Sequence, residues 1–248
     1  IDSIEIDSGS TLIKNAVLDS ISAQVFPRNN GNYLINGILF SKDHFLNVLS
    51  DYNINAHKNA FLIKAYLDIN ELQKDYIPQV QDIEIQSPRS IFANTEIILD
   101  NNLRLLEAQG HIQGEVITAN KTPFQYLRSD FQWINKRFIA NTILRINQRK
   151  SSINTDFDAE SGDYIFTLNG STFSSDFNSI FPKWWQNTFK DFSYTNNTKC
   201  FHDFAFYGTS ESPIPDYFMG SVHTENIEYK SVPVKYGDVL VKGKNYCT

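Results

Sequence analysis

Alternation of apolar and polar residues runs through much of this chain of 248 residues and restricts its fold more than any other feature. Every second residue from Phe61 to Ile69 is apolar, and Lys64 and Asp68 lie at positions between them. The stretches 138–146 and 164–168 follow the same pattern. Successive side chains of a β-strand point to opposite faces of a sheet. The alternation therefore predicts strands with one buried and one solvated face, as is typical of antiparallel sheets.

Other segments extend this reading to most of the chain. Further strands are expected at 82–86, 92–99, 111–119, 129–135, 200–208, 217–229 and 233–242, with turns at 101–102, 161–162 and 169–170. Aromatic residues make up 14% of the chain and there is a single Met, which favours sheets over helices. The predicted fold class is mainly β: an antiparallel sheet of tandem strand-rich repeats, as a curved groove or a sandwich, with a few short helices.

Internal repetition is the second feature. Residues 36–43 and 169–176 are identical at five of eight positions, and Gly-x-Tyr precedes each copy, at Gly31 and at Gly162. Residues 114–120 resemble 220–226, and each is followed by an apolar segment that starts with Pro. The pattern predicts one β-rich unit over 1–248, with about one full repeat, partial copies on either side and a boundary near 70–80, within a longer repeat protein. Coincidence in an Asn- and Phe-rich sequence is the alternative.

Helices are expected to be short. Ser41 and Ser174 each stand before apolar residues at helical spacing, with Asp two positions later. A serine N-cap and a carboxylate in the first turn both stabilise a helix start. Helices are therefore predicted near 42–50 and 175–190, and a third at 70–77. If the repeat is real, 31–49 and 162–181 should superpose as a strand end, a turn and a capped helix start.

Charge and hydropathy exclude some classes of function. The net charge of −6 and the absence of a Lys/Arg cluster argue against nucleic-acid binding. No stretch reaches the roughly 18 apolar residues that a membrane-spanning helix needs, and no signal-peptide pattern is present. We therefore expect no nucleic-acid partner and no transmembrane segment in this chain.

Residues that could support catalysis or metal binding are scattered. His202-Asp203 and His223-x-Glu225 lack a compact ligand set and are interpreted as surface strand residues. The acidic segment 156–162 departs from a calcium-binding loop and is interpreted as a polar hairpin turn. No enzyme, catalytic residue, cofactor or metal is predicted.

The two cysteines allow a geometric prediction. If 200–208, 217–229 and 233–247 form a meander, Cys200 and Cys247 lie two strand spacings apart, about 9.6 Å. A disulfide requires Cα atoms within about 7 Å of each other. Both thiols are therefore expected to be free.

The order of motifs resembles the repeating unit of AsmA-like envelope proteins. A strand beginning Pro123-Phe124 is followed by Phe131-x-Trp133, a long alternating strand, Gly162-x-Tyr164, a Trp-bearing helical segment and a new strand at 200–208. The resemblance covers residues 80–246 and, more weakly, the first 50. It implies a non-catalytic curved β-groove in the cell envelope or periplasm that carries lipid acyl chains or contacts membrane-envelope proteins.

A groove of this kind would need an uncharged inner face. The candidate groove residues are Ile112, Val116, Phe131, Trp133, Phe138, Leu144 and Phe166. The alternative is a closed β-sandwich that acts as a binding or adhesion module for a glycan or a protein, with Trp133, Trp184 and Trp185 as a stacking platform.

Overall fold

A computed structural model describes residues 4–8, 11–13, 16–41, 44–68, 85–181, 183–212 and 214–244. The protein is mainly β, with 73% of its residues in strands, and its sheets are open and antiparallel. The chain divides into two compact units, residues 1–115 with 130–135 and residues 116–129 with 136–248. The predicted fold class is confirmed, and the two units are described separately below.

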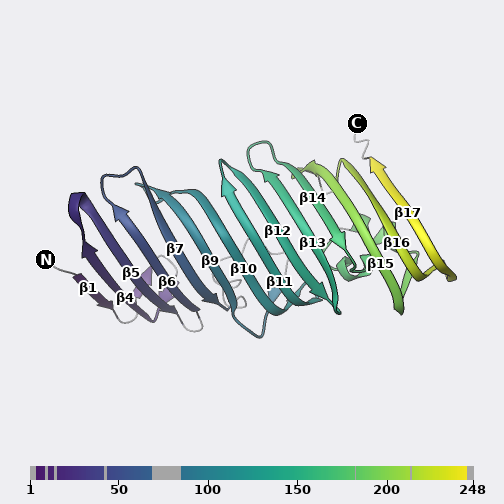
Figure 1. Ribbon diagram of the computed structural model, residues 1–248, viewed down its shortest axis with the longest axis horizontal. Coiled ribbons are helices and arrows are strands. Elements are labelled where there is room, and N and C mark those ends of the chain that lie inside the picture. Colours follow the sequence, from purple (N-terminus) through teal and green to yellow (C-terminus); the bar gives the residue numbers. More distant parts are fainter. Residues whose placement is uncertain are drawn as a thin grey trace. The chain divides into compact units, whose positions relative to one another are not determined.

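The first unit contains one large sheet, whose strands lie side by side in the order β1, β4, β5, β6, β7, β9 and β10 (Figure 1). Their bounds are β1 Ile4–Ser8, β4 Ser20–Pro27, β5 Asn32–Ser41, β6 His44–Asn53, β7 Lys58–Leu67, β9 Ile91–Asp100 and β10 Leu105–Ala119. The end of β10 from residue 116 onward belongs to the second unit. A 3-10 turn, η1, spans Asn29–Gly31, and the short strand β8 (Ile85–Gln86) pairs with β10. Strands β2 (Thr11–Ile13) and β3 (Ala16–Leu18) form a separate hairpin.

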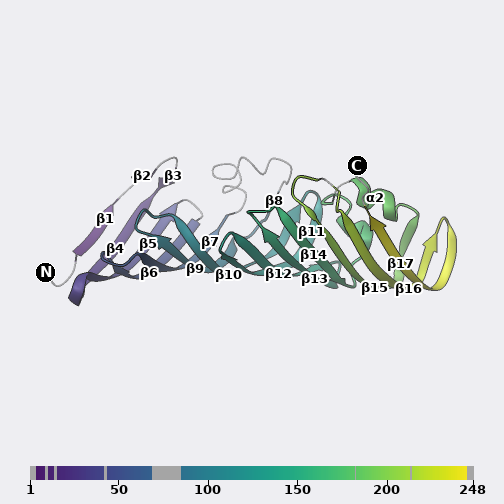
Figure 2. The ribbon, with the colours of Figure 1, turned by 90° about the horizontal axis from the view of Figure 1, so that it is seen from above.

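The second unit holds the first part of β11 (Thr122–Ile134) and a sheet in the order β12 to β17. The bounds are β12 Arg137–Ile146, β13 Arg149–Asp158, β14 Asp163–Gly170, β15 Phe192–Thr209, β16 Tyr217–Tyr229 and β17 Val232–Lys244. Between β14 and β15 lie a 3-10 turn, η2 (Ser174–Phe177), and the helix α2 (Lys183–Phe189). Figure 2 shows α2 on one face of this sheet.

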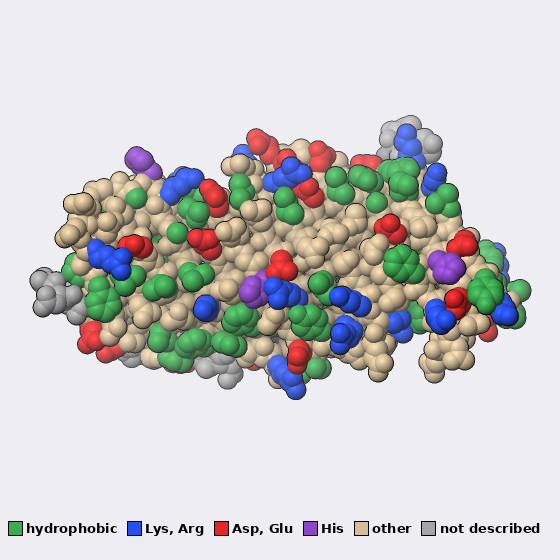
Figure 3. All heavy atoms as spheres, in the orientation of Figure 1, with side chains coloured by type: hydrophobic (Ala, Val, Ile, Leu, Met, Phe, Trp, Pro, Cys, Tyr) green, Lys and Arg blue, Asp and Glu red, His purple; other side chains and the backbone are tan. Residues whose placement is uncertain are grey.

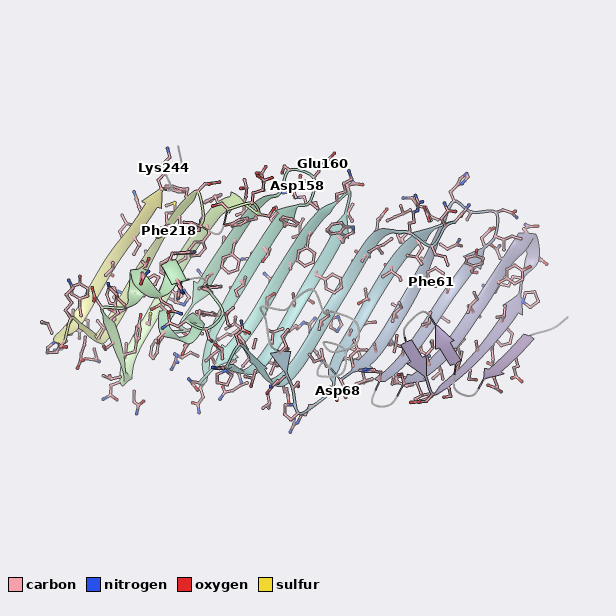
Figure 4. All side chains as sticks on the ribbon, turned by 180° about the vertical axis from the view of Figure 1, so that it is seen from behind. Phe61, Asp68, Asp158, Glu160, Phe218 and Lys244 are labelled. Atoms are coloured by element: carbon pink, nitrogen blue, oxygen red, sulfur yellow. The ribbon has the colours of Figure 1, made fainter. Side chains whose placement is uncertain are left out.

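Each sheet has one apolar face, because strand register places apolar residues opposite one another. In the first unit Leu46, Ala65 and Ala93 pair across β6, β7 and β9. In the second unit Phe166 pairs with Phe206, which pairs with Phe218. Figure 4 shows Phe218 on this face, and Phe61 on that of the first unit. We call these surfaces the apolar faces, and the opposite surfaces the polar faces.

The helix expected near 42–50 is wrong, because residues 44–53 form strand β6. Ser41 is the last residue of β5 and pairs with His44 across a hairpin, so it cannot serve as an N-cap. Alternation of apolar and polar side chains along β6, combined with pairing to both neighbours, outweighs the local helix signal.

The two segments that resemble each other in sequence, 31–49 and 162–181, have similar structures only at their starts. Gly31 and Gly162 both have positive φ, of 76° and 79°, and both stand immediately before a strand. Beyond these strands the segments differ, since β5 turns directly into β6 whereas β14 leads into η2. The predicted superposition of 31–49 on 162–181 is therefore wrong from Ser41 onward. The helix expected at 70–77 and the boundary near 70–80 lie outside the described residues.

The other strands expected from the sequence are present, and of 82–86 the described residues Ile85–Gln86 form β8. Helical structure at 175–190 is confirmed, but Ser174 is the first residue of η2 rather than its N-cap. Strands β15, β16 and β17 form the predicted meander, and Cys200 is a buried free thiol. Cys247 lies outside the described residues.

Candidate functional site

Aromatic side chains form rows across the apolar face of the second unit. In strand order from β12, the outer row is Phe138, Phe157, Tyr164 and Gly208, and the next row is Ala140, Thr155, Phe166, Phe206 and Phe218. Ring centroids of Phe166 and Phe206 are 5.6 Å apart, and those of Phe206 and Phe218 are 6.1 Å apart. Rings that pair across strands stabilise the sheet. Here they also create a continuous aromatic surface.

Two glycines allow these rings to lie close to the sheet. A Cβ atom at Gly220 would overlap the ring of Phe204 on the neighbouring strand, and one at Gly243 would overlap the ring of Phe218. Neither glycine has a positive φ, so the requirement is for space rather than for an unusual backbone. The rings of Phe204 and Phe218 occupy the volume that a side chain at each glycine would fill.

The segment between β14 and β15, residues 171–191, covers the inner part of this face, and we call it the cap. Phe177 and Trp185 of the cap are each 1% exposed. Trp185 packs against Phe189 and Phe204, with centroid distances of 4.5 and 5.8 Å. The cap therefore converts the middle of the apolar face into a closed core.

An ion pair and hydrogen bonds hold the cap in place. Arg149 Nη2 lies 2.9 Å and 3.0 Å from the two carboxylate oxygens of Asp176, and its guanidinium lies 3.7 Å from the ring centroid of Phe173. Asp176 also accepts the backbone N–H of Phe173 at 2.8 Å. Trp185 Nε1 donates to the backbone carbonyl of Ser174 at 2.8 Å. Because the pair is mostly buried, screening by solvent is weaker than at a surface ion pair.

A pocket of about 400 Å³ lies where the cap meets the outer rows of the sheet. We call it the aromatic pocket. Its lining comprises seven aromatic residues, namely Phe138, Phe157, Tyr164, Phe166, Phe181, Trp184 and Phe206, together with Thr155, Ser210 and Pro215. None of these described lining residues carries a charge. A pocket of this size, with apolar walls and a few hydroxyl groups, is typical of sites for apolar small molecules.

Polar groups on the inner side of the cap, and on the sheet beneath it, are buried and neutral. Thr172 Oγ1 lies 2.7 Å from Ser151 Oγ and 3.1 Å from His202 Nε2. Burial lowers the pKa of His202, and it raises the pKa of the Cys200 thiol to about 11 and that of the Tyr194 phenol to about 12. A thiol with such a pKa is a poor nucleophile at neutral pH. The cluster therefore contributes structure rather than reactivity.

His202 corrects one interpretation from the sequence. It was expected on the surface, but it is only 3% exposed, because it lies on the apolar face opposite Gly170 and Val222. His223, the next histidine along the chain, is exposed on the polar face as expected. The acidic segment 156–162 forms the expected hairpin turn only from residue 159 onward, because 156–158 end strand β13; Asp158 accepts the backbone N–H groups of Glu160 and Ser161 in this turn.

The seven groove residues predicted from the sequence are divided between the units. Phe138, Leu144 and Phe166 share the apolar face of the second unit, where Phe138 and Phe166 line the aromatic pocket and Leu144 is 1% exposed. The other four candidate groove residues do not belong to this group. Ile112, Phe131 and Trp133 belong to the first unit, and Val116 belongs to the second.

Val116 shows why simple alternation failed at one position. It is 51% exposed with φ of 55°, whereas the next residue, Ile117, is 5% exposed. A left-handed residue within a strand interrupts the alternation and shifts which positions are buried. The sequence pattern therefore selected the wrong member of this pair.

Several pocket residues were not predicted. Tyr164 and Phe206 lie on strands expected from the sequence, and their aromatic character together with correct pairing could have identified them. Phe157 lies on β13, which was not among the expected strands. Phe181 and Trp184 come from the cap, which reaches the pocket only through the tertiary fold. Trp185 is buried in the core, and therefore cannot form the surface platform considered from the sequence.

The first unit has a different exposed feature. On its polar face, Phe40, Phe45, Tyr66, Phe92 and His111 form a row with successive centroid distances of 5.3, 6.3, 5.1 and 5.6 Å. Phe40 and Tyr66 are 44% and 50% exposed. Figure 3 shows hydrophobic side chains among charged ones on this side of the unit.

The described ranges contain neither a metal-ligand cluster nor a helix that could span a membrane. No group of three or more His, Cys, Asp or Glu residues there could hold a metal ion. No described helix has the length and apolar character needed to cross a membrane. Comparison of the chain with models of protein families, with curated proteins and with solved structures found no match.

Proposed function

We propose that this protein is a non-catalytic segment of the cell envelope that binds lipid acyl chains, with the aromatic pocket of the second unit as the main binding site. The observation that carries this proposal is the pocket itself. It offers about 400 Å³ of space beside an open sheet, and its described lining residues are uncharged.

Burial of apolar surface supplies the driving force. Transfer of one methylene group from water to an apolar site contributes about 0.8 kcal/mol. The half-buried rings of Phe166 and Phe181 expose apolar area that an acyl chain would remove from water. The closed-sandwich alternative has less support, since no second large sheet covers this face among the described residues.

The resemblance to AsmA-like envelope proteins agrees with this proposal. The resemblance implies that an apolar sheet face conducts or holds lipids between membranes. We therefore propose that the protein is located in the envelope or periplasm and takes part in lipid transport.

The proposal can be tested by filling the pocket. Thr155 lies on β13 and lines the pocket, whereas its neighbour Asn154 points to the polar face. The purified chain and the variants Thr155→Trp and Asn154→Trp would be extracted with organic solvent, and the extracts analysed by mass spectrometry. We expect phospholipid or fatty acid to copurify with the parent chain and with Asn154→Trp, and to be strongly reduced in Thr155→Trp.

Absence of lipid from the parent chain, combined with failure to bind added lipid in solution, would contradict the proposal. Equal lipid content in the two Trp variants would place binding elsewhere. Circular dichroism of both variants would establish that their sheets are intact.

A second candidate function is glycan binding on the polar face of the first unit. The exposed aromatic row from Phe40 to His111 favours it, because pyranose rings stack on aromatic side chains. A glycan array probed with the parent chain, Tyr66→Ala and the control Tyr236→Ala tests this candidate. Loss of binding in Tyr66→Ala alone would support it, and absence of binding by the parent chain would remove it.

A further inference from the structure

The charged residues around the aromatic pocket are mostly acidic. The pocket lies at the edge of the second sheet where β12, β14 and β16 begin and β13 and β15 end. The acidic residues at this edge are Asp156, Asp158, Glu160, Asp163, Glu211 and Asp216, and the basic residues are Lys136, Arg137 and Lys244. Figure 4 shows Asp158, Glu160 and Lys244 at the same edge. Asp156, Asp158 and Asp163 are strand neighbours of the lining residues Phe157 and Tyr164 and therefore point to the polar face, whereas Asp216 precedes β16 and follows a lining residue, Pro215.

Two of the three basic residues already face carboxylates. Arg137 Nε donates to Asp156 at 2.6 Å, and Lys136 Nζ lies 3.5 Å from Glu160. Arg137 is next to Phe138 in a strand, so its side chain points to the polar face, away from the pocket. These cations are poorly placed to bind an anionic head group in the pocket.

Asp216 is the carboxylate whose charge acts on a residue of the pocket wall, Tyr164. It directly follows Pro215, which lines the pocket. A Cβ atom at Gly208 would lie 2.8 Å from the Tyr164 hydroxyl and 3.2 Å from the Asp216 backbone nitrogen, so these two groups flank the same glycine. The pKa of Tyr164 is raised by burial and by the negative charge of Asp216. The charge of Asp216 therefore reaches the pocket wall.

We propose that this end of the pocket, at Tyr164 and Asp216, selects amphiphiles with a cationic ammonium head group over those with an anionic one. The inference rests on the proposed function, because it requires that an apolar tail binds in the pocket. Aromatic ring faces attract ammonium groups, and quaternary ammonium ions are recognised by clusters of such rings. The carboxylate of Asp216 adds a direct Coulomb attraction, whereas a carboxylate head group would be repelled.

The experiment compares three ligands that share one tail. Binding of decyltrimethylammonium, decanol and decanoate to the full chain would be measured by calorimetry, below the concentrations at which they form micelles. We expect decyltrimethylammonium to bind about tenfold more tightly than decanoate, with decanol between them. In Asp216→Asn this difference should shrink, mainly through weaker binding of the ammonium compound. Asp238→Asn is the control, because Asp238 is an exposed carboxylate on the polar face of the same unit.

The outcomes separate the two proposals. Equal binding of all three ligands would overturn the charge selectivity and leave acyl-chain binding intact. Failure of all three to bind would overturn both proposals. The ammonium compound could be preferred, and the two substitutions Asp216→Asn and Asp238→Asn could reduce that preference equally. This result would show a general charge effect and would overturn the role of Asp216. Because Asp216 is exposed, neither the Asn substitution nor its control is expected to affect folding.

Discussion

Leu144, Leu168 and Phe204 on the apolar face of the second unit are at most 2% exposed, whereas Val48 and Ile63 on the apolar face of the first unit stay half-exposed. The sheets themselves are similar, since both are antiparallel and both alternate apolar with polar residues. The difference lies in the cap, which packs Phe177 and Trp185 onto the second sheet. In the described part of the first unit, the buried residues of this face are mostly small or polar, such as Ser50 and Asn59, and Ile91 is the large apolar residue among them.

Alternation of apolar and polar residues does not by itself determine whether the apolar face of a sheet becomes a core or stays a surface. About twenty residues inserted between two strands decide it in the second unit, and they also leave a pocket at their margin. The same pattern can therefore support a closed core in one region and an open pocket beside it.

The largest expected effect comes from placing a charge on each apolar face. Leu144→Asp would bury a carboxylate among packed side chains, at a cost of several kcal/mol, and should unfold the second unit. Ile63→Asp puts the same charge on a half-exposed position, where water can reach it, and should cost much less. Hydrogen exchange followed by mass spectrometry reports on peptides of each unit separately. Equal tolerance of the two substitutions would remove the distinction between a closed and an open face.

The second prediction concerns the cap directly. Trp185→Ala removes a ring that contacts Phe189 and Phe204 and leaves Ser174 without its indole donor. We expect a loss of about 3–5 kcal/mol in the free energy of unfolding. Phe61→Ala in the first unit should cost less, because Phe61 is half-exposed. Urea denaturation monitored by circular dichroism provides the values, and a larger loss for Phe61→Ala would contradict the role of the cap.

Much of the sheet could be predicted from sequence because its period of two is a local property. Strand β16 has the expected bounds of 217–229, β12 and β14 cover the alternating segments 138–146 and 164–168, and β7 covers the segment that starts at Phe61 as far as Leu67. The error at 42–50 arose where a serine and an apolar spacing resembled a helix start but pairing with β5 and β7 decided the outcome. Local signals cannot report such pairing.

The candidate site was less accessible to sequence reasoning. Phe138 and Phe166 could be selected from their strands, but Phe181 and Trp184 reach the pocket only because the cap folds back onto the sheet. Val116 was selected in place of Ile117 because a left-handed residue has no simple sequence signature outside Gly and Asn. Burial of His202 likewise depends on the cap above it.

A third prediction compares one glycine on each apolar face. Gly220→Ala introduces a methyl group into the space of the Phe204 ring and 2.6 Å from the Asp203 carbonyl oxygen, and should cost about 1–3 kcal/mol. At Gly37 the nearest atom to an added Cβ is Ala23 Cβ at 3.9 Å, so Gly37→Ala should be neutral or stabilise by up to about 1 kcal/mol. Thermal melting of the two variants measures the difference. Equal melting temperatures would mean that the second face repacks as easily as the first.

The smallest expected effect is a dependence of the second unit on pH. Burial lowers the pKa of His202 in the folded protein, whereas in the unfolded chain it has its ordinary value near 6.5. As the pH falls through about 6.5, the unfolded chain takes up a proton that the folded protein does not, and stability decreases. The carboxyl groups of Asp156 and Glu225, whose pKa values are lowered by Arg137 and Lys199, act in the same direction only below about pH 4.5.

The two contributions can therefore be separated by measuring stability between pH 7 and pH 5. The parent chain should lose protection from hydrogen exchange in peptides of the second unit over this range, and His202→Gln should lose less. The control is His223→Gln, because His223 is exposed on the polar face of the same unit. If His223→Gln flattens the pH dependence and His202→Gln does not, the histidine beneath the cap is not the group that titrates. In that case the closed core of the second unit would be no more sensitive to acid than the open face of the first.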